Sequence, residues 1–399
     1  MVDTEKSSVL IVGTYSGLNK GDRIMQLVSG HAVESLNLDP IISCPFPEVD
    51  KNFYPASWIS KSRRRNLPVS YVLIMILCLL PKILRERFAN FIPELSLFMN
   101  ARLVLDTSGD MLTEDYGPHV ALSHLVPLLI CKLLDKELIV LAQSIGPFKR
   151  LGKLFDLVLS HAKVVTVRDD ISYEYLASRG LKNIQKTADL GFLLAAKPPT
   201  DFKENDYAAR EGRRLIGICP SALFFEKFRS EDAALLTAQF CDVLDRVAEK
   251  NNVDYLLIPH VSTPSGKMDD DIFAAELEKL LATKTTVVSA ALDPAETKFL
   301  ISKLFAMVTF RMHGAIAALD SFVPTLAVSY SHKTDGLFEK LNISQWVVQN
   351  DSHLFEQLEQ KMEALFIEHE AFRSTLLANI PNVRAQAQLN IQAIEAYSK

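Results

Sequence analysis

AMVTFRMHGAIAALDSFVPTLAVSYSH, residues 306–332, is the stretch of the chain that decides its fold. It predicts an apolar strand over 306–314, a short alanine-rich helix, and a second apolar strand over 324–332. Each strand is apolar at successive positions, which is typical of strands that helices cover on both faces. Two strands joined by one helix in this way predict a parallel pair within an α/β sheet.

The same alternation of strand and helix continues toward both ends of the chain. Residues 8–13 (SVLIVG) predict a buried strand of a first half, and the alternation restarts with the strand at 214–221 (RLIGICPS). Between the halves, residues 196–213 are rich in charged side chains and contain Pro-Pro, which predicts a linker. We therefore expect an α/β fold of two doubly wound Rossmann-like domains, 1–195 and 214–399, that face a cleft, the second domain ending in helices.

The composition excludes several classes of protein. Of the 399 residues, 48% are hydrophobic and 23% are charged, which is enough apolar material for a sizeable core and excludes a disordered chain. The net charge of −5 argues against a general nucleic-acid binder, because such a protein needs a basic field. Five widely spaced cysteines without a C-x-x-C pair indicate neither a disulfide framework nor a zinc site. Together with an N-terminus that lacks a secretory pattern, they favour a cytoplasmic protein.

Residues 69–80 (VSYVLIMILCLL) are an almost wholly apolar run. They are too few to span a bilayer, which takes about 20 apolar residues. Basic residues lie on both sides of the run, at 61–65 and at 82–87. Two interpretations of the whole segment 61–87 therefore stay open: a helix buried in the core, or a helix that rests on an anionic membrane surface.

Polar side chains follow four predicted strands of the second half. Ser221, His260 and Lys333 each come after a strand, and Arg311 and His313 lie where a strand gives way to a helix. Because the carboxyl ends of parallel strands share one edge of a sheet, we expect an electropositive pocket for a small anion. Histidine can move protons near neutral pH, and Arg311 faces the same side in an extended segment. His313 is therefore a candidate general acid or base, with a structural histidine as the alternative.

The first half also places polar residues after its strands. Asn19 and Asp22 lie in a loop whose glycines do not have the G-x-G-x-x-G spacing of a dinucleotide site, and Gln143 ends a later strand. Another turn carries Asp110 and further acids at 114 and 115. These acids could bind a metal ion, but they lack the pattern of a calcium loop, so solvated carboxylates are the default interpretation.

Arg168 ends another predicted strand of the first half, after four residues that favour strands. A guanidinium in such a place needs an anionic partner. That partner is either a bound carboxylate or phosphate, or one of the neighbouring side chains Asp169 and Asp170.

Taken together and in this order, the motifs resemble those of the polysaccharide pyruvyltransferase family. The glycine-rich N-terminal loop, the turn at 109–112, the Q-x-I-G-P segment, the R-D-x-x-S signature and the R-x-H-x-x-x-x-A motif all match, from residue 9 to about residue 340. The residues that carry the resemblance are Gly13, Asn19, Gly21, Asp22, Gly109, Asp110, Leu112, Gln143, Ile145, Gly146, Pro147, Arg168, Asp169, Ser172, Ala188, Asp189, Arg311, His313, Ala318, Pro324, Tyr330 and Lys333. The usual triple-glycine turn is Thr107-Ser108-Gly109 here, and residues 51–95 match none of the motifs.

The resemblance implies a two-domain fold like that of the B-type glycosyltransferases and an enzyme that transfers pyruvate from phosphoenolpyruvate to a saccharide diol as a cyclic ketal. It implies phosphoenolpyruvate as the co-substrate, no metal and no further cofactor. The acceptor would be a saccharide of a cell-surface polysaccharide, for which a lipid-linked form is common in such pathways, so the inner face of the membrane is an alternative place for the protein. The resemblance assigns catalysis to His313 and Arg311, donor binding to Arg168, Arg311, Lys333, Ser221 and His260, and acceptor binding from the first domain to Asn19, Asp22, Asp110 and Gln143.

Two other functions stay open at this point. A nucleotide-sugar glycosyltransferase of the same architecture is one, although many such enzymes carry two glutamates eight residues apart in the C-terminal half, and no such pair occurs after residue 200. The other is a membrane-associated scaffold without catalytic activity. It would bind no small anion at Arg168 and Arg311.

Overall fold

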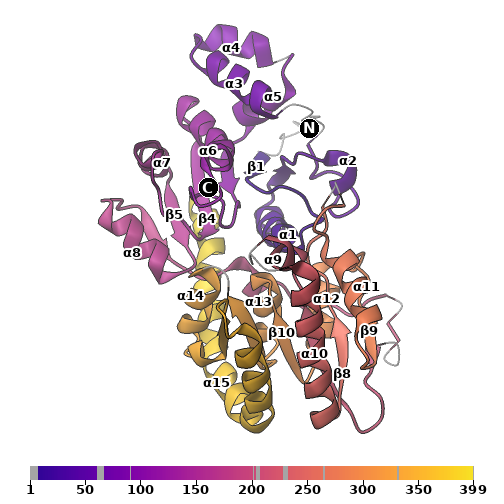
Figure 1. Cartoon of the computed structure of the whole chain (residues 1–399). Helices are drawn as coiled ribbons and strands as arrows, with labels where there is room; N and C mark the ends of the chain where they lie inside the picture. The colour runs from indigo at the N-terminus through magenta and orange to yellow at the C-terminus, as the bar shows by residue number, and fades with distance from the viewer. Residues whose placement is uncertain are drawn as a thin grey trace. The chain divides into compact units, whose positions relative to one another are not determined.

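The computed structural model describes residues 8–60, 67–89, 91–200, 202–203, 207–227, 232–263, 266–329 and 332–398. The chain divides into two compact units (Figure 1). Unit 1 comprises residues 1–17, 22–193 and 384–399, and unit 2 comprises residues 18–21 and 194–383. Each unit contains one six-stranded sheet in which every adjacent pair of strands is parallel.

The sheet of unit 1 has the strand order β2-β1-β3-β4-β5-β6. Its strands are β1 (Ser8–Val12), β2 (Asp39–Ile42), β3 (Leu103–Asp106), β4 (Glu137–Gln143), β5 (Val164–Val167) and β6 (Ile184–Lys186). The helices between them are α1 (Lys20–Ser35), α2 (Pro47–Asp50), α3 (Leu67–Cys78), α4 (Lys82–Ala89), α5 (Pro93–Asn100), α6 (Pro118–Leu133), α7 (Gly152–Leu159) and α8 (Asp170–Ser178).

Two hydrophobic clusters lie on opposite faces of this sheet. Leu10 and Val12 of β1 belong to the cluster that contains residues of α3, α5 and α6, whereas Val9 and Ile11 belong to the cluster with Val33 of α1. Successive side chains of a strand point to opposite faces, so a strand that is buried on both faces must be apolar throughout. This is the reason why the unbroken apolar runs of the sequence predict the parallel sheet.

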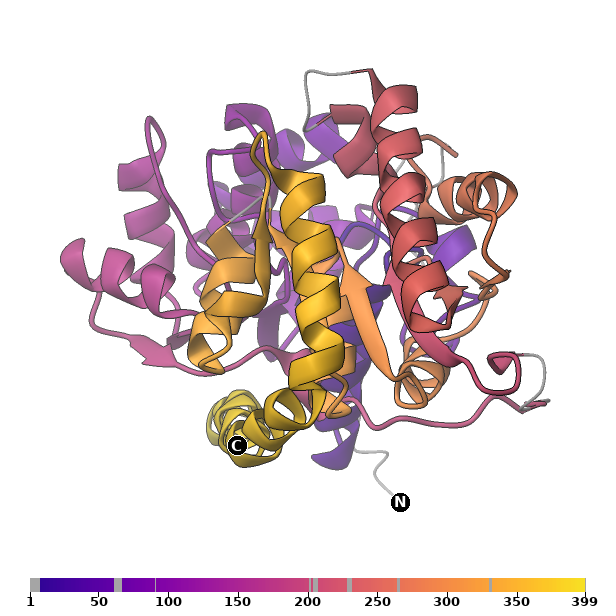
Figure 2. The ribbon, with the colours of Figure 1, turned by 60° about the horizontal axis from the view of Figure 1, so that its bottom comes forward.

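The sheet of unit 2 has the strand order β12-β11-β10-β7-β8-β9. Figure 2 shows α10 and the amino-terminal part of α15 in front of its strands. The strands are β7 (Arg214–Cys219), β8 (Val253–Leu257), β9 (Thr285–Val287), β10 (Ala306–Thr309), β11 (Thr325–Ser329) and β12 (Val347–Gln349). The helices are α9 (Ala222–Lys227), α10 (Ala233–Asn251), α11 (Asp270–Leu280), α12 (Pro294–Ile301), α13 (Met312–Asp320), α14 (His332–Lys340) and α15 (Leu354–Tyr397).

The two strands that open the sequence analysis are shorter than predicted. The strand expected over 306–314 ends at Thr309, because the Thr309 hydroxyl donates to the carbonyl of Arg311 and accepts the Arg311 N–H, which closes a turn before α13. The strand expected over 324–332 ends at Ser329, and α14 begins at His332. Arg311, His313 and Lys333 therefore lie at the starts of helices, not within strands.

The C-terminal tail belongs to unit 1, whereas the sequence predicted that it is part of the second domain, 214–399. Residues 384–399 belong to unit 1, although they continue the helix α15. Ile394 is wholly buried in a hydrophobic cluster of unit 1, and the Asn390 amide oxygen accepts a hydrogen bond of 2.6 Å from the Thr166 hydroxyl of β5. Burial of Ile394 and satisfaction of Asn390 account for the return of the tail to the first sheet.

Candidate active site

The topology of unit 2 brings three loops with predicted site residues to one edge of the sheet. Strand β7 lies between β10 and β8. The next strands of the chain, β8 and β9, lie on one side of it, and the later strands β10, β11 and β12 lie on the other side. In doubly wound folds, ligands bind at this switch point, outside the carboxyl ends of the strands. Ser221 follows β7, His260 follows β8, and Arg311 and His313 follow β10.

The carboxylate of Asp270 connects these three loops. It accepts two hydrogen bonds from Arg311, of 2.9 Å from Nε and 2.6 Å from Nη2, and it also accepts the backbone N–H groups of Ala222 and Val261. Asp270 is wholly buried. Burial raises the pKa of Asp270, and the positive charge of Arg311 opposes that rise. The pair fixes the guanidinium of Arg311 beside the amino end of α13.

The sequence analysis did not select Asp270. The signal was present as a run of three aspartates, 269–271, directly before the apolar positions of a helix. Asp269 accepts the N–H of Thr263 within the preceding loop, and Asp270 points to the strand ends. Carboxylates at the start of a helix usually cap the helix and interact with its dipole. The pattern therefore does not reveal that Asp270 also binds distant loops.

Residues 18–21 of the N-terminal loop belong to unit 2. The backbone N–H of Lys20 donates to the carbonyl of His260 at 3.0 Å, and its ammonium group donates to the carbonyls of Ala290 and Leu292. Asn19 forms a backbone bridge with Val261. The resemblance placed Asn19 in the first domain as an acceptor ligand, but the structure places it in the unit of the predicted donor residues. Lys20, which the sequence analysis did not select, anchors the loop there.

Gly21 lies directly against the imidazole of His313. A Cβ atom at this position would stand 2.4 Å from Nδ1 of His313 and 2.9 Å from its Cε1 atom. These distances are shorter than any normal contact, so only glycine lets the helix α1 begin this close to the ring. The Asn19 side chain caps that helix start by accepting the Gly21 N–H at 2.9 Å.

Positively charged groups surround His260 at this edge of the sheet. Burial lowers the pKa of His260 to about 3, and Lys20, His313 and Arg311 lower it further. His260 is therefore neutral at physiological pH, and its Nδ1 atom lies 3.3 Å from the thiol of Cys219. The predicted donor ligand His260 is a buried neighbour of the cationic groups.

Ser221 and Lys333, the other two predicted donor residues, differ in their surroundings. Ser221 is wholly buried, and its hydroxyl accepts the N–H of Phe224 at the start of α9. Lys333 lies in the first turn of α14, which follows β11. Burial lowers the pKa of Lys333 to about 7. Tyr330, which carries part of the resemblance, lies outside the described residues.

In unit 1, Gln143 is part of a buried network at the carboxyl ends of β3 and β4. Its amide donates to the backbone carbonyl and to Oδ2 of Asp106, at 3.1 and 3.0 Å, and its amide oxygen accepts the Ser108 hydroxyl. Gly13 packs on the same carboxylate, because a Cβ there would stand 2.1 Å from Oδ1 of Asp106. The wholly buried Gln143 therefore holds two loops together.

Asp106 makes this network sensitive to pH. Burial raises the pKa of Asp106 to about 7, and hydrogen bonds from Ser108 and Gln143 limit the rise. Because the folded state holds this proton more tightly than the unfolded state, the free energy of unfolding falls as pH rises from about 4 to about 7. In urea denaturation, the free energy of unfolding of the wild type should fall by about 1 kcal/mol between pH 6 and pH 8. This fall should be absent in Asp106→Asn. Asp242→Asn, at an exposed site, is the control, and an unchanged pH dependence in Asp106→Asn would refute the assignment.

Arg168 has protein partners in unit 1. Its Nη1 atom donates to Asp189 at 2.6 Å and its Nε atom donates to the hydroxyl of Ser144 at 2.9 Å. The pair is buried. Asp189 is thus an anionic partner of Arg168. Of the two neighbours, Asp169 caps α8 through the N–H of Ser172, and Asp170 pairs with Lys186.

Of the remaining predicted acceptor residues, Asp22 lies in the first turn of α1, at the end of the loop after β1, and Asp110 lies on the loop after β3. Asp22 accepts the N–H of Tyr15 at 3.2 Å, and Asp110 accepts the hydroxyl of Tyr116 at 2.8 Å. Glu114 accepts the backbone N–H groups of residues 149–151 and so fastens the chain ahead of α7. Within the part of the chain that the structure describes, no group of three His, Cys, Asp or Glu side chains is placed to hold a metal ion.

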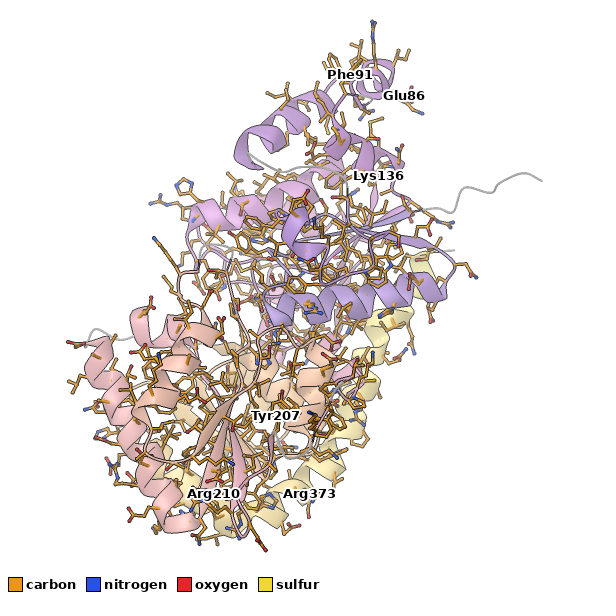
Figure 3. The ribbon with its side chains drawn as sticks, turned by 90° about the vertical axis from the view of Figure 1, so that its right-hand side faces the viewer. Glu86, Phe91, Lys136, Tyr207, Arg210 and Arg373 are labelled. Carbon is orange, nitrogen blue, oxygen red and sulfur yellow. The ribbon has the colours of Figure 1, made fainter. Side chains whose placement is uncertain are left out.

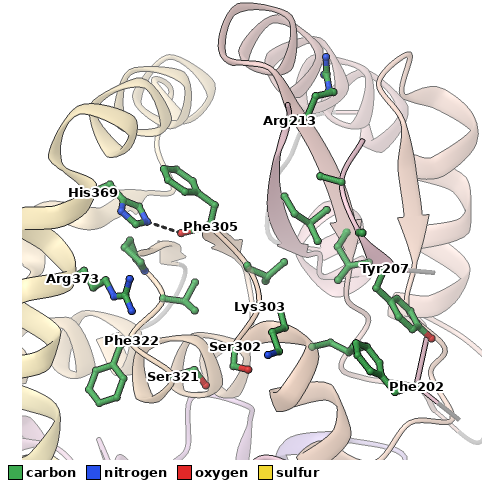
Figure 4. A pocket seen from close by; sticks show the side chains of 18 residues that line it. Phe202, Tyr207, Arg213, Ser302, Lys303, Phe305, Ser321, Phe322, His369 and Arg373 are labelled. Atoms are coloured by element: carbon green, nitrogen blue, oxygen red, sulfur yellow. Dashed lines mark hydrogen bonds between the residues drawn. The ribbon is translucent and has the colours of Figure 1, made fainter. Parts of the chain in front are cut away.

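A cavity of about 550 Å³ lies at the opposite edge of the second sheet, where β7 and β10 begin (Figure 4). Its walls include aromatic side chains and the basic groups of Lys303 and Arg373. Beside them, Nε2 of His369 donates to the carbonyl of Phe305 at 2.8 Å. None of the predicted site residues lines this cavity. Strand β10 separates the cavity from Arg311 and His313, so we place the candidate site at the carboxyl edge.

Comparisons of the sequence with known proteins identify a family. The polysaccharide pyruvyl transferase family matches residues 19–332. The amylovoran biosynthesis protein AmsJ of Erwinia amylovora is 23% identical over 369 residues, which cover 84% of this chain and 86% of AmsJ.

Solved structures show the fold. A putative UDP-N-acetylglucosamine 2-epimerase from Listeria monocytogenes has a TM-score of 0.65 at 14% identity and covers 99% of this chain and 97% of its own. A UDP-GlcNAc 2-epimerase from Neisseria meningitidis, with a TM-score of 0.62 at 10% identity, covers 98% and 99%. A ugt transferase from Siraitia grosvenorii, with a TM-score of 0.58 at 11% identity, covers 99% and 100%. These likenesses confirm the predicted pair of Rossmann-like domains of the glycosyltransferase B type. Because the family match spans most of the chain, the protein belongs to the polysaccharide pyruvyl transferase family.

Proposed function

We propose that this protein transfers the pyruvyl group of phosphoenolpyruvate to two hydroxyl groups of a saccharide, and so forms a cyclic ketal. The family makes the chain a transferase of polysaccharide biosynthesis. The observation that supports phosphoenolpyruvate as the donor is the cluster of Lys20, His313 and Arg311 around His260. The charges of all three lower the pKa of His260. A small dianion such as phosphoenolpyruvate is the ligand that such a cluster favours.

The reaction needs one acid, one anion site and two bases. Protonation of C3 of the enol leaves positive character on C2. The two saccharide oxygens then add to C2, the bond from C2 to the phosphate oxygen breaks, and inorganic phosphate leaves. C3 gains one proton and the two hydroxyl groups each lose one, so the second proton leaves with the phosphate or the solvent. A group that gives the first proton must lie beside the anion site.

His313 fits the role of the acid by its place. It lies in the first turn of α13, whose amino end carries the positive end of the helix dipole. Arg311, the residue that precedes this helix, is fixed by Asp270. Anionic groups bind readily at such helix starts, and the guanidinium adds a donor pair of fixed direction. Lys333, one strand further along the sheet, supplies another cationic group at pH values below about 7.

The acceptor is assigned to the loops after β1 and β3 of unit 1. Asp22 and Asp110 are the carboxylates there that the sequence resemblance selects. Either carboxylate can accept a hydrogen bond from a sugar hydroxyl and then take its proton. Gln143 and Arg168 already have buried protein partners, so in this proposal they shape the loops.

The donor is tested by calorimetric titration with phosphoenolpyruvate. We expect saturable binding that Lys333→Gln weakens by about tenfold, because one charge-assisted hydrogen bond is lost. Lys153→Gln, at an exposed site of unit 1, is the control and should bind as the wild type does. A UDP-sugar is titrated in parallel, since two UDP-GlcNAc 2-epimerases of this fold were solved with UDP-GlcNAc bound. Binding of the UDP-sugar without phosphoenolpyruvate would replace the proposal with a glycosyltransferase.

Arg311 requires a paired variant in the same titration. Arg311→Ala alone would leave the buried carboxylate of Asp270 without its partner, which costs about 3–5 kcal/mol of stability. Arg311→Gln with Asp270→Asn replaces the ion pair by two amides and leaves no buried charge. We expect this double variant to remain folded by circular dichroism and to lose phosphoenolpyruvate binding. Unchanged binding would show that Arg311 serves the fold and not the donor.

A further inference from the structure

The helices α3 to α5 of unit 1 expose large apolar side chains over a continuous stretch of chain. Leu79 is 72% exposed, Ile83 is 79% exposed and Phe91 is 78% exposed, and Leu73, Ile76 and Phe88 are exposed as well. Helix α4 has no buried residue at all among its described positions. Side chains of this size are normally buried, and a contiguous apolar patch on a surface marks a contact with a partner or a membrane.

The opposite side of the same helices is part of the core. Ile74, Leu77 and Cys78 of α3 are buried in the hydrophobic cluster that contains Leu125 of α6. Leu73 and Ile76 are three residues apart on α3, so they share a side of the helix that differs from the buried side, and the exposed Leu79 follows directly after the helix ends. The interpretation as a core helix therefore holds for one face of the apolar run, and another face is exposed.

Basic side chains accompany the exposed apolar ones. Lys82, Arg85 and Arg87 lie on α4, against one acid, Glu86. Figure 3 shows the side chains of Glu86 and Phe91 at the end of this helical group that is remote from the first sheet. The segment from 73 to 91 thus carries a net positive charge in a chain whose net charge is −5. The basic residues at 61–65 lie outside the described residues.

We propose that this apolar and basic face of α3 to α5 docks on the surface of an anionic lipid bilayer. Leu79, Ile83 and Phe91 enter the acyl boundary, and the cations of α4 meet the lipid phosphates. No helix in the described part of the chain is long and apolar enough to cross the bilayer, so the contact is peripheral. A second copy of this chain would bring the same cations against Lys82 and Arg87, which disfavours self-association through this face.

The docking goes beyond the proposed reaction and does not depend on it. Its consequence for the reaction is the class of acceptor: an enzyme held at a bilayer is suited to a saccharide carried on a lipid. Binding to vesicles is measured without any substrate, so a failure of phosphoenolpyruvate binding and a failure of docking are separate results.

The test is co-sedimentation of the full chain with vesicles. We expect binding to vesicles of phosphatidylcholine with 30% phosphatidylglycerol, and binding at least about tenfold weaker to pure phosphatidylcholine, because each cation contributes about fivefold on an anionic surface. Leu79→Ser with Ile83→Ser should weaken the anionic partition coefficient by about 30-fold or more through lost burial. Lys82→Gln with Arg87→Gln removes two cations and should weaken it by about 25-fold and reduce its salt dependence.

The matched control changes two exposed isoleucines of unit 2. Ile272 is 58% exposed and Ile367 is 87% exposed, so Ile272→Ser with Ile367→Ser removes similar apolar surface elsewhere. This variant should bind vesicles as the wild type does. The proposal is overturned if the wild type binds neither kind of vesicle, or if the two serine pairs weaken binding equally. It is also overturned if light scattering shows a dimer that Leu79→Ser with Ile83→Ser dissociates, because a second copy then covers the face.

Discussion

His313→Ala is expected to lose at least about 100-fold in turnover while it still binds phosphoenolpyruvate, because a positioned acid contributes about 10²–10⁴-fold to a proton transfer. The imidazole lies in the first turn of α13, beside the Arg311–Asp270 pair that is assigned to the anion. Removal of the ring takes away the proton donor and leaves the cations of the site. The measurement is kcat from phosphate release, with the dissociation constant of phosphoenolpyruvate from calorimetry.

Two further variants make this result specific to the ring. His353→Ala removes an exposed histidine of the same unit and should leave kcat unchanged. His313→Gln keeps a hydrogen-bond donor of similar reach but cannot transfer a proton near neutral pH, so it should be as slow as the alanine variant. A kcat within tenfold of the wild type in His313→Gln would show that the ring positions the donor and that another group, such as Lys333, provides the proton.

The sequence predicts the sheets well because burial on both faces leaves a direct pattern. Val9 to Val12 and Ala306 to Val308 are all apolar, because these positions are buried whichever way each side chain points. Strand ends are less apparent. Phe310 and Met312 lie beyond Thr309, and the strand ends at the turn that the hydroxyl contacts of Thr309 with Arg311 close. The local side chain that ends an element is thus harder to recognise than the burial that defines it.

The sequence identifies only some residues of the candidate site. His313 and Arg311 are found because they follow an apolar strand at a place where folds of this class bind ligands. Asp270 is missed, because its partner Arg311 lies 41 residues away and no local spacing connects them. Arg168 is interpreted through its neighbours, although its partner is Asp189 at a distance of 21 residues. Ion pairs that join separate loops become visible only when the strands are ordered in the sheet.

The loop at 18–21 is a further case of the same kind. Its position directly after the first strand assigns it to the first domain by any local criterion, yet it belongs to unit 2. The backbone hydrogen bond from Lys20 to His260 and the contact of Gly21 with His313 depend on residues more than 200 positions away. In this loop the glycine is needed for close approach to a side chain, not for an unusual backbone angle.

Gly21→Ala is therefore expected to lower kcat by about 100-fold without unfolding the protein, because a displacement of a catalytic group by about 1 Å can cost that much. The new Cβ would stand 2.4 Å from Nδ1 of His313, so the ring must move. The backbone itself tolerates the change: Gly21 is in helix α1, where alanine is favoured over glycine by about 1 kcal/mol. Thermal unfolding should show equal or greater stability than the wild type, and calorimetry should show retained binding of phosphoenolpyruvate.

The double variant Gly21→Ala with His313→Ala decides whether the glycine acts through the imidazole. If the only effect of the added methyl group is to displace the ring, its effect disappears once the ring is absent, and the double variant has the kcat of His313→Ala alone. A further loss of about 100-fold in the double variant would mean that the methyl group disturbs another part of the site, of which the Lys20 anchor is the nearest. A single variant with normal kcat would mean that His313 does not work from the position in which Gly21 holds it. The double-mutant cycle thus tests the contact of Gly21 with His313, and kcat is its readout.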